Sequence, residues 1–145
     1  MLSMKAKYGL RALSMLAKEY GKGPVLILDL AKQERIPHKF LELILLELKK
    51  KGILQSKKGK GGGYLLIRPP SAISMGELIR ALDGPLALLP CVSQTAYSRC
   101  DECPDEKTCG IRSVIKEVRD STARILDGTS LADIVERSRR VTEPE

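Results

Sequence analysis

A tract rich in glycine and lysine lies between two short apolar runs, and it limits the available folds more than any other feature. Its sequence is QSKKGKGGG at residues 55–63, and the apolar runs are residues 53–54 and 64–67. Apolar runs on either side of a glycine-containing turn are typical of a β-hairpin. The glycines precede a strand, and no Gly-x-x-x-x-Gly-Lys-Ser/Thr is present, which argues against a nucleotide-binding loop. We therefore expect a hairpin with a long, flexible, basic tip.

Three stretches with helical periodicity precede this hairpin. Apolar residues recur at spacings of three and four, which predicts helices over residues 3–20, 28–34 and 38–51. A break of only three residues, 35–37, separates the second helix from the third, and Pro37 suits a helix start. The residues expected to face inward are Ala6, Leu10, Leu13, Ala17 and Tyr20 in the first helix and Leu41, Ile44, Leu45 and Leu48 in the third.

The rear half predicts three further helices, over residues 74–83, 111–126 and 131–138. The first opens with a capping box from Ser74 to Glu77. The second carries a stripe at alternating spacings of four and three, typical of a coiled-coil seam; it consists of Ile111, Ile115, Val118, Thr122 and Ile125. We interpret this stripe as a contact between two copies of the chain, although packing within one domain is the commoner use of such a stripe.

This order of elements predicts a mostly α fold with a small β-hairpin. It corresponds to a winged helix-turn-helix domain plus a long C-terminal dimerisation helix. We divide the chain into residues 1–84 as the winged helix-turn-helix DNA-binding domain, residues 85–110 as a cysteine-containing sensor loop, and residues 111–145 as the dimerisation helix and C-terminal tail.

The charge is confined to one half of the chain. Residues 1–70 hold 15 Lys or Arg and 5 Asp or Glu, whereas residues 71–145 hold 10 and 13, and the whole chain carries +7. A basic half followed by a slightly acidic one suggests a polyanion-binding module and a second module with another task. A solvated basic surface without a partner is the alternative interpretation.

The winged arrangement adds double-stranded DNA as the expected polyanion. The N-terminal residues of the third helix would reach base edges in a major groove. Glu42 could accept a hydrogen bond from a cytosine amino group, and Lys39 would contact phosphate. At the hairpin tip, Lys58 and Lys60 would neutralise phosphates, and Gly59 would let the backbone approach closely. A flexible hairpin with solvated lysines is the alternative.

Composition excludes several other functions. Aromatic residues make up 3% of the chain and Trp is absent, so a base-stacking platform for single-stranded nucleic acid is not expected. No apolar stretch approaches the roughly 20 residues that span a bilayer. Arg11 interrupts the N-terminal apolar run before a signal-peptide core could form. We expect a cytoplasmic protein with no membrane partner.

Five segments together resemble a known bacterial family. They are KYGLRAL at 7–13, FLELILLELKKKGIL at 40–54, KGKGGGYLL at 58–66, LIRALDGPLALLPC at 78–91 and ILDGTSLADIV at 125–135. The chain is similar to the IscR-type, BadM-like winged helix-turn-helix regulators, which include NsrR, RirA and CymR. The resemblance implies a homodimer that represses or activates genes. It places DNA contacts on Lys39, Glu42, Lys58, Gly59 and Lys60. Lys39 stands where many members carry a small polar residue.

Four cysteines lie within 19 residues, at Cys91, Cys100, Cys103 and Cys109. Without a secretory signal, a reducing compartment favours thiolate ligands over disulfides. Four thiolates can hold zinc or an iron–sulfur cluster, and the spacing alone does not choose between them. Thiols without a metal, with a redox or structural role, are a third interpretation.

The family resemblance favours an iron–sulfur cluster, either [2Fe–2S] or [4Fe–4S]. It implies three cysteine ligands, Cys91 and Cys109 as the first and last, with Cys103 fitting the middle position better than Cys100. Arg112 stands where some members carry a histidine ligand, and an arginine cannot ligate. Cys100, an acidic residue or another chain would then supply the fourth ligand. The alternative is a metal-free regulator that responds to a small molecule or a partner protein in cysteine or sulfur metabolism.

An enzymatic role is not expected. Cys100 and Cys103 form a Cys-x-x-Cys pair, the arrangement of thiol oxidoreductases, but acidic residues surround it and disfavour the thiolate. No thioredoxin-like βαβ pattern accompanies the pair. The only histidine, His38, lies in the helix expected to read DNA. The sequence therefore predicts a DNA-binding transcriptional regulator whose operator affinity depends on a cluster or on thiol redox state in the cysteine loop.

Overall fold

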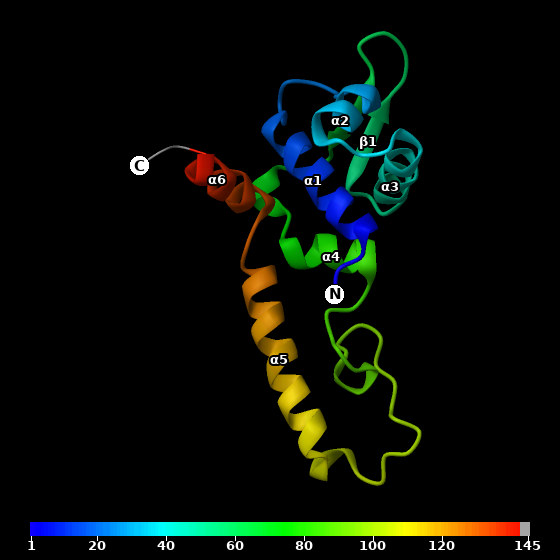
Figure 1. The fold of residues 1–145 in the computed structure, drawn as a ribbon, viewed down its shortest axis with the longest axis vertical. Coiled ribbons are helices and arrows are strands. Elements are labelled where there is room, and N and C mark those ends of the chain that lie inside the picture. The colour runs from blue at the N-terminus through cyan, green and yellow to red at the C-terminus, as the bar shows by residue number, and fades with distance from the viewer. Residues whose placement is uncertain (143–145) are drawn as a thin grey trace.

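The computed structural model describes residues 1–142, which form six α-helices and one antiparallel hairpin (Figure 1). The prediction of a mostly helical winged fold is confirmed. In chain order the elements are α1 (Met4–Lys18), α2 (Ile27–Glu34), α3 (His38–Lys50), β1 (Leu54–Lys57), β2 (Gly63–Leu66), α4 (Met75–Asp83), α5 (Gly110–Asp127) and α6 (Leu131–Thr142). The end of the expected C-terminal tail, residues 143–145, lies outside the described residues.

The first four helices and the hairpin enclose one aliphatic core. All four α3 residues expected to face inward are buried, so that prediction is confirmed. The α1 face is only partly as predicted, because Leu16 is buried whereas Tyr20 lies beyond the helix end and is exposed. The reason is that α1 packs against α3, α4 and α6, so its buried face is wider than a single stripe.

The turn between α2 and α3 sets the direction of α3. Arg35 adopts a left-handed conformation with φ of +54°, and the amide of Ile36 donates to the carbonyl of Ala31 at 3.0 Å. These features end α2 and bury the Ile36 side chain. The chain then enters α3 at His38, as the three-residue break predicted.

The hairpin is longer and its tip shorter than expected. β1 pairs with β2 from Leu54 opposite Leu66 to Lys57 opposite Gly63, so residues 55–57 belong to the strand rather than to the tip. Gly63 is required by the chain itself: its φ is +144°, and a Cβ there would lie 2.2 Å from the carbonyl oxygen of Val25. This close approach lets Val25 pair with Tyr64 through two hydrogen bonds of 2.9 Å.

α4 begins at the predicted cap, but the capping box is half formed. The Ser74 hydroxyl accepts a hydrogen bond from the amide of Glu77 at 3.1 Å. The Glu77 carboxylate, however, pairs with Arg68, which follows the hairpin, instead of returning to the helix start. The pair joins the base of the wing to α4.

The rear of the chain extends away from this core and then returns to it. Figure 1 shows α5 running outward, with the irregular segment between α4 and α5 beside it. α6 packs back against α1, and its first residue, Leu131, is fully buried in the core. Among residues 1–142, no helix is both long and apolar enough to cross a bilayer.

Candidate nucleic-acid interface and cysteine loop

The first turns of α3 present an outward face made of unpaired side chains. Lys39 and Glu42 are both exposed, while Leu41 and Leu45 on the opposite side anchor the helix in the core. In the described part of the chain, the Glu42 carboxylate makes no hydrogen bond or ion pair. An exposed carboxylate without an internal partner can accept a hydrogen bond from a ligand.

Glu47, one and a half turns later, shows the contrasting arrangement. Its carboxylate pairs with Lys5 at 2.7 Å and with Lys51 at 3.0 Å. The hydrogen bond from Lys5 is the main cause that lowers the pKa of Glu47 below its usual 4.5. Glu47 therefore fastens α3 to α1, whereas Glu42 has no such contact among residues 1–142.

The hairpin tip is cationic and fully accessible. Lys58, Gly59 and Lys60 are exposed, and neither lysine has an ion-pair partner among residues 1–142. Gly59 has φ of +88°, a conformation that other residues rarely adopt, and open space where a Cβ would stand. The structure thus places all five predicted DNA-binding residues on the surface, three at the tip and two on α3.

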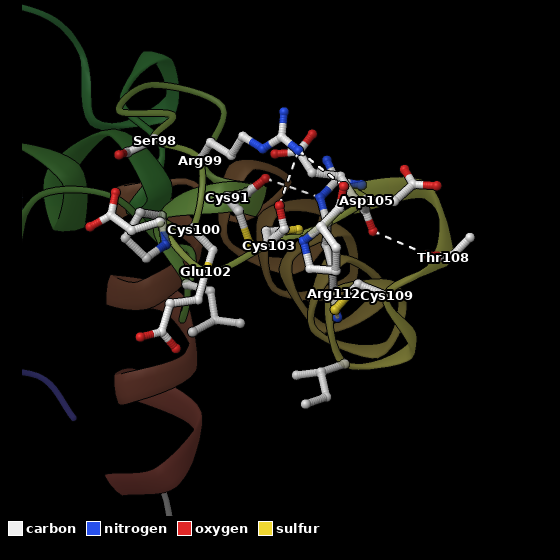
Figure 2. Close-up of a pocket in the computed structure, with 16 residues that line it drawn as sticks. Cys91, Ser98, Arg99, Cys100, Glu102, Cys103, Asp105, Thr108, Cys109 and Arg112 are labelled. Atoms are coloured by element: carbon white, nitrogen blue, oxygen red, sulfur yellow. Dashed lines mark hydrogen bonds between the residues drawn. The ribbon is translucent and has the colours of Figure 1, made fainter.

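All four cysteines line one cavity of about 800 Å³ between the loop and the start of α5 (Figure 2). Cys91 is buried, Cys103 and Cys109 are half-buried, and Cys100 is exposed. Arg99 and Arg112 also line the cavity. The sequence analysis placed the four cysteines at one site, and the structure brings all four to the wall of this cavity.

The cavity wall is held by hydrogen bonds from the loop and from α5. The Cys109 thiol caps α5 by accepting from the amide of Arg112 at 3.4 Å. The Arg112 side chain donates through Nε to the carbonyl of Cys91 at 3.3 Å, as Figure 2 shows. The Cys103 amide donates to the Cys100 carbonyl at 3.1 Å, which closes a turn between these cysteines. Arg112 therefore holds the loop in place instead of acting as a ligand.

The four thiols are chemically suitable metal ligands, but their positions in the structure do not form a metal site. Four cysteine thiols around one cavity form the soft donor set that iron–sulfur clusters use. Within residues 1–142, no three Cys, His, Asp or Glu side chains are arranged to hold a metal ion. Metal-binding loops often gain their final geometry only on binding, and the chemistry of the four side chains, not their arrangement, is what matches an iron–sulfur cluster.

Two further arginine contacts, which the sequence analysis missed, join α5 to the loop and to α4. Arg119 donates to the carbonyl of Val92 at 2.6 Å. Arg80 on α4 forms a two-bonded ion pair with Asp127 at the end of α5, with distances of 2.7 and 2.9 Å. The sequence did carry one signal for the Arg119 contact. Arg112 and Arg119 are seven residues apart, about two helical turns, so both lie on the same face of α5.

A compact three-helix unit with an exposed third helix and a cationic hairpin defines a winged helix-turn-helix DNA-binding protein. The sequence matches the Rrf2 family, described as iron-dependent transcriptional regulators, over residues 2–137. The chain belongs to this family. It is a transcriptional regulator and not an enzyme, and the resemblance found in the sequence is confirmed.

Relatives and solved structures agree with this assignment. A Rhodobacter capsulatus protein named as an Rrf2-like HTH-type transcriptional regulator is 42% identical over 93% of this chain and 92% of its own length. The HTH-type regulator CymR of Bacillus subtilis is 32% identical over 92% of this chain and 88% of its own length. The structure of CymR, described as the global cysteine regulator, superposes with a TM-score of 0.78, covering 94% of this chain and 97% of CymR. The structure of IscR from T. potens superposes with the same score, at 28% identity, over 100% and 93% of the two chains.

Proposed function

We propose that this regulator binds duplex DNA as a homodimer in the bacterial cytoplasm, and that the state of its cysteine loop sets its affinity. The observation that supports this most is that four cysteines share one cavity beside α5, the helix that connects the loop to the winged domain. The three parts of the proposal are DNA contact, dimerisation and sensing.

DNA contact would come from two surfaces. Glu42 is our candidate for reading a cytosine, because its exposed carboxylate has no internal partner to give up. Lys39, Lys58 and Lys60 would contact phosphates, and Gly59 would allow the tip to approach the backbone closely. The α3 surface would supply sequence preference, and the wing would supply most of the salt dependence.

Dimerisation would use an apolar stripe on α5 that nothing in the described chain covers. Ile111 is 71% exposed and Ile125 is 60% exposed, and Val114 and Val118 are exposed between them. Ile111, Val118 and Ile125 are seven residues apart, the repeat of a helical seam. Ile115 and Thr122, which the sequence analysis placed in the same stripe, are half-buried.

The sensing step would act through the arginines of α5. Arg112 and Arg119 bond consecutive carbonyls, those of Cys91 and Val92, so a rearranged loop must alter both contacts. The Asp127–Arg80 pair joins the other end of α5 to α4, which packs on α1. A change at the cysteines would in this way alter how α5 holds the winged domains. Such couplings are typically about 1–3 kcal/mol.

The residues that would hold an iron–sulfur cluster are Cys91, Cys103 and Cys109, with Cys100 as the fourth ligand. The family's description as iron-dependent and the likeness to IscR support this assignment. A bound cluster would supply a centre that oxidation, nitric oxide or iron shortage alters. This chain would contribute four cysteine side chains as ligands, all of which line one cavity at the start of α5.

The test is to purify the protein anaerobically and to measure iron, sulfide, visible absorption and affinity for genomic DNA fragments. We expect coloured protein whose affinity changes about 5–150-fold when the iron is removed. Cys109→Ser should abolish both the colour and this change, whereas Ser98→Ala, in the same cavity wall, should preserve them. Colourless, iron-free protein after reconstitution would contradict the iron–sulfur proposal.

A metal-free regulator is the second candidate, and two observations favour it. The relative CymR is described as a global cysteine regulator. The cavity of about 800 Å³ is also large enough for a small molecule. In this case iron-free protein should bind DNA, and a sulfur metabolite or a partner protein should change that affinity. Indifference to all of these, together with a response to iron, would exclude it.

A further inference from the structure

Leu43 is an apolar side chain held outward on α3, beside the residue proposed to read DNA. It is 65% exposed and is absent from the hydrophobic core. It directly follows Glu42 and lies one helical turn after Lys39, so the three side chains share the outward face of the first turns. A single exposed leucine needs no explanation on an ordinary surface. Its place on this face is what distinguishes Leu43.

The chemistry of leucine restricts what it can recognise in a major groove. Its side chain has no hydrogen-bonding group. If it covered a base edge that offers only donors and acceptors, those groups would lose their hydrogen bonds to water and gain none from the protein, which costs free energy. The C5-methyl group of thymine is the apolar feature that the major groove displays. Burying a methyl group against leucine removes apolar surface from water on both sides.

We propose that Leu43 is a specificity-determining residue that contacts a thymine methyl group next to the base pair that Glu42 reads. The proposal rests on the proposed role of α3 in DNA reading. Glu42 and Leu43 are consecutive in α3, so their side chains start about 1.5 Å apart along the helix axis and about 100° apart around it. This axial separation is smaller than the roughly 3.4 Å between base pairs. The two side chains therefore reach the same or adjacent base pairs, and the preferred site should contain a thymine beside the cytosine.

The test starts from a duplex that the protein itself selects from a random pool. Each thymine in that duplex is replaced in turn by deoxyuracil, which lacks only the methyl group. We expect replacement of one thymine per half-site to lower the affinity of the unaltered protein about fourfold. This is the change that corresponds to the loss of one buried methyl group. The affinity of Leu43→Ala should be lower on the thymine duplex and should not respond to deoxyuracil.

Two matched variants separate a methyl contact from a general disturbance of the helix. Leu43→Met keeps an apolar side chain and should keep the response to deoxyuracil. Leu46→Ala removes a leucine that is 40% exposed one turn further on, beyond the N-terminal residues that reach bases, and should also keep the response. Because Leu43 lies outside the core, Leu43→Ala should melt within a few degrees of the unaltered protein.

The outcomes distinguish this proposal from the role of α3 itself. If no thymine responds, or if Leu43→Ala responds as strongly as the unaltered protein, the methyl contact is wrong while α3 can still read DNA through Glu42. If Glu42→Ala leaves base preference unchanged as well, then α3 does not read this DNA and both proposals fail.

Discussion

At the scale of single residues, the two glutamates on α3 have different surroundings although both belong to the same helix. Glu47 is paired with Lys5 and Lys51, and Glu42 has no partner among the described residues. We predict that Glu42→Ala relaxes preference at one base pair, at a cost of about 1–3 kcal/mol for the preferred base. Binding to duplexes that differ at single positions measures this.

Glu47→Gln is the matched control for that change. It should lower the melting temperature, because Lys5 and Lys51 lose their partner, and it should leave base preference unchanged. An equal loss of affinity on every duplex with Glu42→Ala would contradict its role as a reader.

The lysines of the wing tip lead to a prediction about salt rather than about sequence. Each phosphate contact releases counterions, so the logarithm of affinity falls with the logarithm of salt concentration. We predict that Lys58→Ala weakens binding to all duplexes by similar factors and reduces that slope by about one. Titrations at several salt concentrations measure it. Lys116→Ala, on exposed α5, should leave the slope unchanged, and an unchanged slope for Lys58→Ala would remove the wing from the interface.

At the scale of elements, the junction between α4 and α5 should make stability depend on acidity. The ion pair with Arg80 lowers the pKa of Asp127 below its usual 3.8. As the pH falls below that value, the unfolded chain takes up a proton at Asp127 before the folded chain does. The stabilisation by this pair is therefore complete above about pH 3.8 and is lost as the pH falls through the lower, folded value.

Asp127→Asn should remove this part of the acid dependence, so its melting temperature should approach that of the unaltered protein at low pH. Melting curves across this range measure the difference. Glu117→Gln is the control, because it alters an exposed carboxylate on the same helix that has no ion pair among residues 1–142. It should leave the acid dependence of the melting temperature almost unchanged. If the melting temperatures of Asp127→Asn and the unaltered protein differed by the same amount at every pH, the ion pair would not be a source of the acid dependence.

At the scale of the whole molecule, the uncovered stripe on α5 leads to a prediction about assembly. We predict that Val118→Glu converts a dimer into a monomer, because a carboxylate would be buried at the centre of the seam. Affinity for a palindromic site should fall about 100-fold or more, since the two winged domains no longer bind together. Sedimentation and DNA titration measure the two effects. Lys116→Glu introduces the same side chain away from the stripe and should leave the dimer intact, and a monomeric unaltered protein would refute the dimer.

The order of elements and the inward face of α3 followed from the sequence, because both depend on local periodicity and turn chemistry. The Ser74 cap and the break before α3 are local in the same sense and lie where they were expected, and the hairpin differs only in that its strands extend further into the tip. The outward position of Lys39 and Glu42 followed directly from burial of the opposite face. The sequence analysis recognised that the glycines of the tip allow a close approach of the backbone. It did not show that Gly63 must lack a side chain because the backbone of Val25, 38 positions earlier, lies against it.

Other properties depended on contacts between residues distant in sequence, and only the tertiary structure decided them. The wider buried face of α1 exists because α6 returns to pack on it, and no local pattern predicts that return. Glu77 pairs with Arg68 rather than with its own helix start, and Arg80 meets Asp127 across 47 positions. Side-chain periodicity reports which face of an element is buried. It does not report which element buries it, because that choice depends on the joint packing of the whole chain.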